Sequence, residues 1–183
     1  MTGPVLSRKL QELVDYLDSL TARASVEELD RRLRTLNIAV DDVRDYVQFN
    51  EANYRRNLIR GGEWYDLLVL CWRSGQRSPI HNHAESTCGL KVLKGVATET
   101  KFEMTPSMLI KAVLSIDQHE GEICANQDAD MHQISNLQAP GRDLITMHIY
   151  TPPLRKMKTF SLTERSVGVY IPEIIEYSFG SGI

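Results

Sequence analysis

The segment GQRSPIHNHAESTCGLKVLKG, residues 75–95, decides the fold that we expect for this chain. It contains two of the five histidines, His81 and His83, separated by a single residue. In an extended strand, residues two positions apart point to the same face, so both imidazoles can reach one metal ion. Imidazole is a common ligand of iron, zinc, copper and nickel, and the segment therefore predicts a metal site.

A second segment, GEICANQDADMHQISN at residues 121–136, has a related spacing, in which His132 precedes Asn136 by four positions. The two segments together resemble the paired motifs of the cupin superfamily, G-x5-HxH-x4-E-x6-G and G-x5-P-x-G-x2-H-x3-N. Glycines at the motif ends permit the tight turns between barrel strands. The resemblance implies that His132 is the third ligand of the site that His81 and His83 begin.

The chain departs from these motifs at two places. Cys88 replaces the carboxylate of the first motif, and Gln127 and Ala129 replace the proline and glycine of the second. Without that carboxylate the site holds three neutral imidazoles, and a thiolate substrate could supply the missing negative charge, because soft sulfur binds iron well. Glu85 is an alternative ligand, but it falls in an expected turn, so we favour a position in solvent or beside the site.

The apolar residues follow a different pattern in residues 1–50 than in residues 51–183. The first part has leucines at helical spacing, with Ser7 and Ser25 as candidate caps of two helices, and we expect a third helix from Asp41 to about Phe49. The second part has short runs rich in β-branched and apolar residues between turn residues, which are typical of a barrel or sandwich. These runs lie at 66–72, 89–93, 96–102, 143–150 and 166–170.

The fold class expected is therefore mainly β. No internal repeat and no Pro/Ser-rich linker divides the chain, so we expect a single cupin domain over residues 1–183. Residues 51–183 would form the jelly-roll β-barrel, and the N-terminal α-helices of residues 1–50 would pack on one side of it.

Composition argues against several classes of protein. The net charge is −3, from 21 basic and 24 acidic residues, which gives no basic patch for nucleic acid. No stretch approaches the ~20 apolar residues of a membrane span, and the first residues lack the apolar core of a secretory signal. We therefore expect a cytoplasmic monomer with no membrane partner. Three cysteines are too few for a disulfide framework, and no phosphate loop or dinucleotide fingerprint indicates an organic cofactor.

Two more segments lie on either side of the histidines. Residues 54–58 read Tyr-Arg-Arg-Asn-Leu, and residues 146–153 read Thr-Met-His-Ile-Tyr-Thr-Pro-Pro. They resemble the Tyr-x-Arg-Asn-Leu and Ser-x-His-x-Tyr-Ser-Pro-Pro segments of the cysteine dioxygenase family. Cys88 stands where the mammalian members have the cysteine of a Cys–Tyr thioether. The resemblance extends from about Tyr54 to Phe160.

This resemblance implies an enzyme with one Fe(II) as its cofactor, bound by His81, His83 and His132. The reaction implied is the oxidation of L-cysteine by O2 to cysteine sulfinic acid.

The resemblance also implies roles around the metal. Arg56 would pair with the substrate carboxylate, to which its planar guanidinium can bond bidentately, and Tyr54 would line the substrate pocket. Tyr150, held by His148, would donate a hydrogen bond near the reacting sulfur. Cys88 would lie in the site, with a cross-link to Tyr150 as the favoured expectation.

Other functions remain open at this stage. The related 3-mercaptopropionate dioxygenases have Gln in place of Arg56, so arginine favours cysteine without excluding another small thiol acid. Thr87 and Thr146 depart from the mammalian pattern, which leaves the fine tuning of substrate choice open. A non-catalytic cupin that binds a metal or ligand is a reading of another class, as is an isomerase or hydrolase using zinc or manganese.

Overall fold

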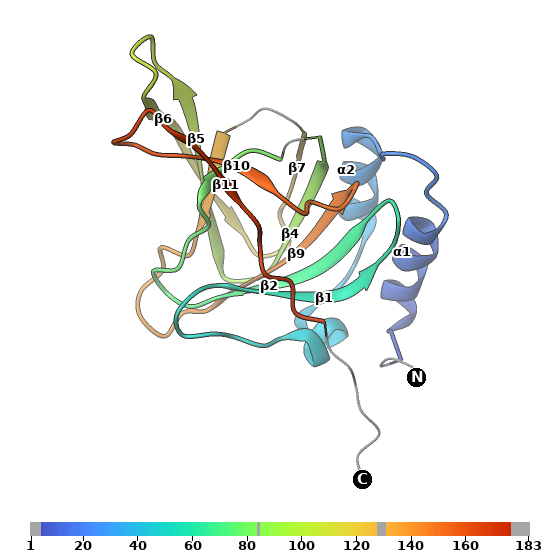
Figure 1. The fold of residues 1–183 in the computed structure, drawn as a ribbon. Coiled ribbons are helices and arrows are strands. Elements are labelled where there is room, and N and C mark those ends of the chain that lie inside the picture. The colour runs from blue at the N-terminus through green and yellow to red at the C-terminus, as the bar shows by residue number, and fades with distance from the viewer. Residues whose placement is uncertain (1–4, 84, 128–130, 177–183) are drawn as a thin grey trace.

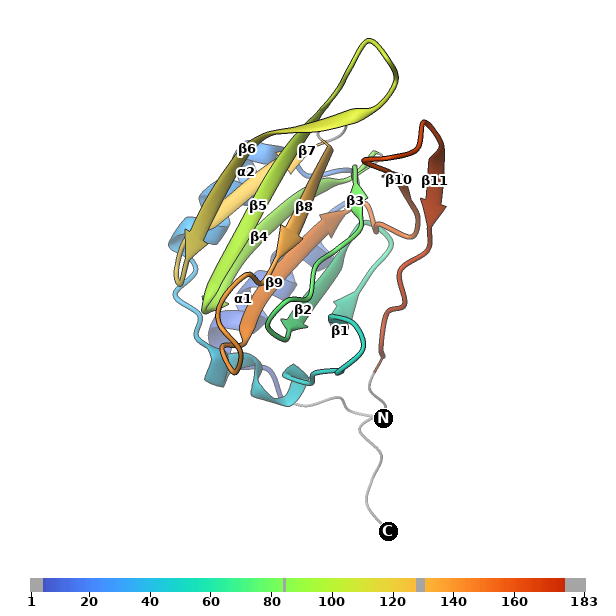
Figure 2. The same ribbon diagram turned by 90° about the vertical axis from the view of Figure 1, so that its left-hand side faces the viewer.

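Two antiparallel sheets form the body of the protein in a computed structural model, which describes residues 5–83, 85–127 and 131–176. The first sheet has the strand order β1-β2-β9-β4-β7, and the second has the order β11-β10-β3-β8-β5-β6. Figures 1 and 2 show the two sheets facing each other. Side chains from both sheets share one buried cluster, which includes Leu70, Val92, Ile134 and Met157. This arrangement is a cupin jelly roll, as the two motifs predicted.

The strands of the first sheet are β1 (Arg55–Gly61), β2 (Asp66–Trp72), β4 (Thr87–Lys94), β7 (Ile123–Gln127) and β9 (Leu144–Thr151). The strands of the second sheet are β3 (Ile80–His81), β5 (Val96–Met104), β6 (Ile110–His119), β8 (Met131–Ser135), β10 (Met157–Phe160) and β11 (Val167–Tyr170). Each of the five runs found in the sequence corresponds to one of these strands, with only Asp143 and Ser166 falling just before β9 and β11. The motif position Ala129 lies outside the described residues.

Strand β2 is buried along its whole length because both of its faces are covered. Leu67, Val69 and Cys71 belong to the cluster under the N-terminal helices. Leu68 and Leu70 alternate with them and face the space between the two sheets. A continuous apolar run in the sequence therefore marks the strand that separates the two hydrophobic clusters.

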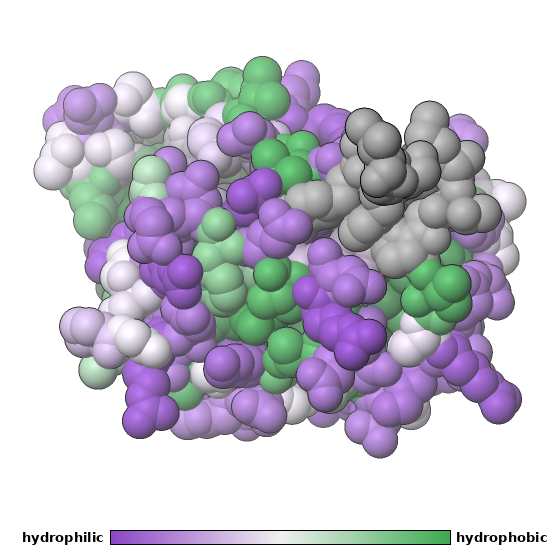
Figure 3. All heavy atoms as spheres, turned by 90° about the horizontal axis from the view of Figure 1, so that it is seen from below, coloured by the Kyte–Doolittle hydropathy of each residue, from purple (hydrophilic) through white to green (hydrophobic). Residues whose placement is uncertain are grey.

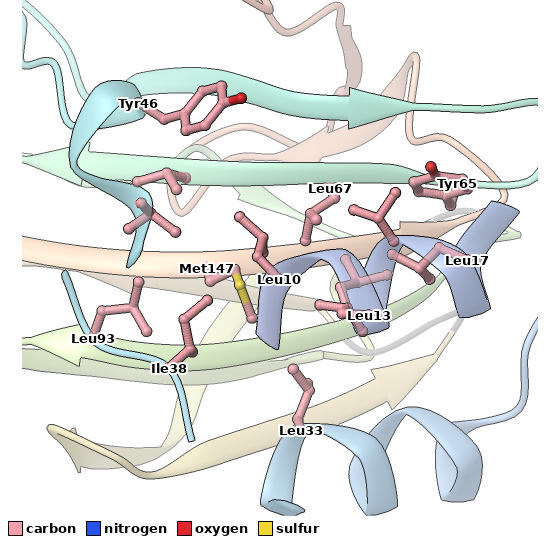
Figure 4. Packing of buried hydrophobic residues seen from close by; sticks show 14 of the residues in the cluster. Leu10, Leu13, Leu17, Leu33, Ile38, Tyr46, Tyr65, Leu67, Leu93 and Met147 are labelled. Carbon is pink, nitrogen blue, oxygen red and sulfur yellow. The ribbon is translucent and has the colours of Figure 1, made fainter. Parts of the chain in front are cut away.

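The N-terminal helices α1 (Arg8–Asp18) and α2 (Val26–Thr35) cover the outer face of the first sheet (Figures 1 and 4). Their caps are those expected, since Ser7 accepts a hydrogen bond from Leu10 N–H and Ser25 accepts one from Glu28 N–H. The third helix is a 3-10 helix, η1 (Val40–Tyr46), which ends three residues before the expected limit. Among the described residues, no helix has the length and apolarity needed to cross a membrane.

Gly89 allows α2 to approach β4 closely. A Cβ atom placed on Gly89 would lie 2.7 Å from Leu33 Cδ1, which is shorter than van der Waals contact allows. We therefore expect Gly89→Ala to lower the free energy of unfolding by about 1–3 kcal/mol, as other overpacked cores do. Equilibrium denaturation measures this change, and an unaltered midpoint would mean that α2 does not pack on β4 as described.

Candidate metal centre and active site

Three histidines converge between the sheets. His81 ends β3, His83 follows two residues later, and His132 lies on β8 directly opposite His81 in the antiparallel pair. One ring nitrogen of each lies within 4.8 Å of the others, and at most 5% of each residue is exposed. The structure thus brings together the three residues that the two motifs predicted as ligands. The HxH pair is not wholly in a strand, however, because β3 ends at His81.

The donor set suits a metal ion. Burial lowers the pKa of His81 to about 3 and that of His83 well below its usual value, so these imidazoles are neutral, which is the form that binds metals. His81 Nδ1 lies 2.9 Å from the carbonyl oxygen of Pro79, so Nδ1 carries the proton and Nε2 keeps its lone pair. The Nε2 atoms of His83 and His132 are 3.0 Å apart. A cation between them would use both lone pairs.

A residue that the sequence motifs did not indicate supports the third histidine. The Glu99 carboxylate on β5 accepts a hydrogen bond from His132 Nδ1 at 2.7 Å, and only 2% of Glu99 is exposed. Burial opposes its ionisation, but the bond from His132 lowers the pKa of Glu99 below its usual value. The only sequence signal was an acidic residue in the otherwise apolar or neutral start of a strand.

Arg56 on β1 brings a positive charge into the same region. The residue is 4% exposed, and its Nε and Nη2 atoms have no hydrogen-bond partner among the described residues. Its guanidinium carbon lies 5.1 Å from the ring centroid of Tyr150. Tyr54 directly precedes β1, and its ring stacks on that of Trp72 with ring centroids 4.2 Å apart. A buried cation with free donors is a receptor for an anion such as a carboxylate.

A chain of hydrogen bonds connects Trp72 to Tyr150. The Trp72 indole N–H donates to Thr146 Oγ1 at 3.0 Å, Thr146 Oγ1 lies 2.9 Å from His148 Nε2, and His148 Nδ1 lies 3.2 Å from the Tyr150 hydroxyl. An indole only donates, so the Thr146 oxygen accepts from Trp72, and the Thr146 hydroxyl still has a proton and a lone pair for His148 Nε2. Burial keeps His148 neutral by lowering its pKa, so one ring nitrogen carries a proton and the other accepts. In the tautomer with the proton on Nδ1, His148 donates to the Tyr150 oxygen and the phenol proton points away from His148.

Cys88 on β4 is the direct cross-strand partner of Tyr150 on β9. Opposed side chains on one face of an antiparallel pair have Cβ atoms ~5 Å apart, so the two side chains are neighbours. Burial raises the pKa of both the Cys88 thiol and the Tyr150 hydroxyl, and both keep their protons.

The remaining candidate residues are placed as follows. Cys71 is fully buried in the helix-facing cluster. Cys124 is half-buried and lines the cavity. Glu85 lies in a turn and is exposed, which agrees with a solvated role, and His119 is exposed at the end of β6.

One cavity between the sheets is lined by the three histidines, Glu99, Arg56 and Tyr150. Its wall is formed by Tyr54, Arg56, Leu70, Trp72, Ser78, His81, His83, Cys88, Leu90, Glu99, Gln118, Cys124, Asn126, His132, Ile134, His148 and Tyr150. A metal site, a cation for an anionic group and a positioned phenol thus lie around a single space. This arrangement can hold a small ligand that carries both a metal-binding atom and a carboxylate.

Comparison with known proteins gives a consistent family. The family model described as cysteine dioxygenase type I matches residues 3–163. Cysteine dioxygenase type 1 from Rattus norvegicus is 29% identical over 162 residues, which are 84% of this chain and 79% of that protein. The Danio rerio protein of the same name is 28% identical over 158 residues, 82% of this chain and 78% of its own length.

Solved structures support the fold alone. A Klebsiella pneumoniae protein with a double-stranded β-helix domain aligns with a TM-score of 0.52 at 15% identity, over 83% of this chain and 98% of its own. A Thermus thermophilus protein aligns with a TM-score of 0.51 at 14% identity, over 63% of this chain and 98% of its own.

Proposed function

The chain belongs to the cysteine dioxygenase type I family, and on this premise we propose that it oxidises L-cysteine with O2 to cysteine sulfinic acid at one ferrous ion. As a member of that family it is a dioxygenase, an oxidoreductase that adds both atoms of O2 to its substrate. We propose His81, His83 and His132 as the ligands of the iron. The observation that carries the proposal is that this histidine group and the unpartnered nitrogens of buried Arg56 line one cavity.

The residues around the cavity suggest how the substrate is held. Arg56 would bond to the cysteine carboxylate with its Nε and Nη2 donors, which fixes one end of the substrate. The thiol would then face the three histidines. The stacked rings of Tyr54 and Trp72 would form the cavity wall near β1 and β2. The chemistry that a bound ferrous ion supplies is the activation of O2 toward the thiol sulfur, which ends at the sulfinic acid level.

Tyr150 would serve as the hydrogen-bond donor to the reacting group. With the His148 proton on Nδ1, the chain from Trp72 through Thr146 and His148 would leave the phenol proton free to point into the cavity. A fixed donor stabilises charge that develops on the substrate without having to reorganise during the reaction. Thr146 fills the serine position of the family pattern, and its hydroxyl is able to make the same bond to His148.

We also propose a thioether between Cys88 and Tyr150. The Cys88 sulfur would bond to the ring carbon beside the hydroxyl, with loss of the S–H and C–H hydrogens. Two electrons and two protons would pass to O2, which becomes hydrogen peroxide. The cross-strand pairing of the two residues supports this, because it places their side chains next to each other on one face of the sheet.

The thioether predicts a change in mass. Protein incubated with iron, cysteine and air should become lighter by two hydrogen atoms, and Cys88→Ser should keep the mass expected from its sequence. Intact-protein mass spectrometry measures both, and Cys71→Ser, which changes a thiol in the other cluster, is the matched control. Unchanged mass in the wild type after many turnovers would remove the cross-link from the proposal.

We propose that the protein acts as a cytoplasmic monomer. Its three cysteines are free thiols, which suits a reducing compartment. Figure 3 shows one face that is mainly hydrophilic, with hydrophobic residues in small groups, as expected for a surface in contact with water. Sedimentation of the purified protein tests the oligomeric state.

The decisive experiment is oxygen uptake by the iron-loaded protein with L-cysteine and 3-mercaptopropionate side by side, with products identified by mass. We expect cysteine to be preferred and cysteine sulfinic acid to form in proportion to the O2 consumed. Preference for 3-mercaptopropionate would keep the iron site but change the substrate. No uptake by protein that holds iron would favour the binding-protein alternative.

A further inference from the structure

Glu99 occupies a position that suits a role in the metal site itself. One carboxylate oxygen accepts from His132 Nδ1 at 2.7 Å, and the other lies 3.3 Å from the Gln118 amide nitrogen and 3.8 Å from Cys124 Sγ. The carboxylate is therefore held at both oxygens in a space where only 2% of the residue is exposed.

The three histidines are not supported equally. His81 donates to a backbone carbonyl, His132 donates to a carboxylate, and His83 Nδ1 has no partner among the described residues. An imidazole that donates to a carboxylate is more basic than one that donates to a carbonyl, and it is held in one tautomer and one orientation. His132 is therefore the ligand whose electron donation the protein reinforces.

This support compensates for the carboxylate that the first motif lacks. Cys88 stands where the cupin motif has Glu, so the ligand set carries no negative charge of its own. Glu99 on β5 places one negative charge behind His132, one imidazole ring away from the metal position. The charge is present without filling a coordination position, which stays open for substrate.

We propose that Glu99 is a positioning residue that supplies, through His132, the negative charge missing from the ligand set, and so strengthens iron binding and stabilises the oxidised ion. The inference rests on the proposed function, because it takes iron as the bound metal. It concerns the strength and potential of the site rather than which substrate is oxidised.

The test compares Glu99→Gln, Glu99→Asp and Glu103→Gln with the wild type. Gln keeps the shape and can accept from His132 but removes the charge, whereas Asp keeps the charge on a shorter arm. Glu103 lies exposed on the same strand and provides the matched control. Ferrous ion affinity is measured by competition with a chromogenic chelator, and the iron midpoint potential by spectroelectrochemistry.

We expect Glu99→Gln to raise the Kd for Fe(II) about 10–100-fold and to raise the midpoint potential, since a negative charge favours Fe(III) over Fe(II). Each tenfold by which the affinity for Fe(III) falls more than the affinity for Fe(II) raises the midpoint potential by about 59 mV. Glu99→Asp keeps the charge, so its midpoint potential should stay near the wild-type value even where its Kd for Fe(II) rises. Glu103→Gln should change neither quantity.

A purely structural role for Glu99 predicts a different result. In that case Glu99→Gln would lower the melting temperature of the metal-free protein, while the rise in melting temperature on adding Fe(II) stayed the same. Unchanged Kd and potential in Glu99→Gln overturn the proposal. If wild-type protein binds Fe(II) but does not oxidise cysteine, the proposed function fails while the role of Glu99 stands; if wild type does not bind Fe(II), both fail.

Discussion

Replacement of His132 with alanine is expected to abolish stoichiometric iron binding and, with it, all cysteine oxidation. His132 would supply one of three protein ligands, and its Nε2 lies 3.0 Å from that of His83. Four-ligand zinc sites bind with about 10–16 kcal/mol, so one ligand is worth roughly 3–4 kcal/mol, or two to three orders of magnitude in Kd. Iron content after gel filtration, together with Kd from chelator competition, measures the effect.

His119→Ala is the matched control, because His119 is an exposed histidine at the end of β6. It should retain the iron content and activity of the wild type. His132→Ala leaves the Glu99 carboxylate buried without its main partner, so its metal-free stability must be measured beside the wild type. If His132→Ala folds and still carries one iron per chain, the third ligand lies elsewhere and the site proposed here is wrong.

Replacement of Arg56 with alanine is expected to lower kcat/KM for L-cysteine by about 10²–10³-fold without loss of iron. Breaking a buried charge pair by removing one partner has an effect of about 3–5 kcal/mol, and the lower part of this range, about 3–4 kcal/mol, corresponds to that factor. The substrate carboxylate would be the partner removed from Arg56, whose Nε and Nη2 are otherwise unbonded. Steady-state oxygen uptake and iron analysis of the same preparation separate the two quantities.

Two comparisons sharpen this test. Arg55→Ala changes the neighbouring arginine, whose side chain alternates to the other face of β1, and should leave kcat/KM unchanged. Cysteamine has the thiol and amine of cysteine but no carboxylate, so the rate at which it is oxidised should be the same in Arg56→Ala as in the wild type. Full cysteine turnover by Arg56→Ala would show that the carboxylate binds at another place.

Local sequence patterns predicted the helices, the strands and the candidate metal ligands. The caps Ser7 and Ser25 were predictable because the first N–H groups of a helix need a hydrogen-bond acceptor, which a side chain within three residues can supply. The run at 66–72 was predictable as a strand because every residue after Asp66 is apolar, which is typical of a strand covered on both faces. His81 and His83 were readable as a pair because their spacing alone brings them close.

Some expectations were only partly right, for local reasons. The segment near residue 41 forms a 3-10 helix and ends at Tyr46 rather than Phe49, which short apolar patterns cannot distinguish from an α-helix. Cys124 was not predicted as a cavity residue, because which alternate side chains of β7 face the space between the sheets depends on how the sheets pack.

The sequence by itself determined the class of fold, the three histidines and the segments that resemble the dioxygenase family. The tertiary structure alone decided that Glu99 supports His132, that Trp72 begins the hydrogen-bond chain to Tyr150, and that Arg56 has unbonded donors inside the cavity. The physical reason is sequence distance. Ligand spacing and capping act over a few residues of one segment, whereas these contacts join side chains from different strands, and only the packing of the sheets brings them together.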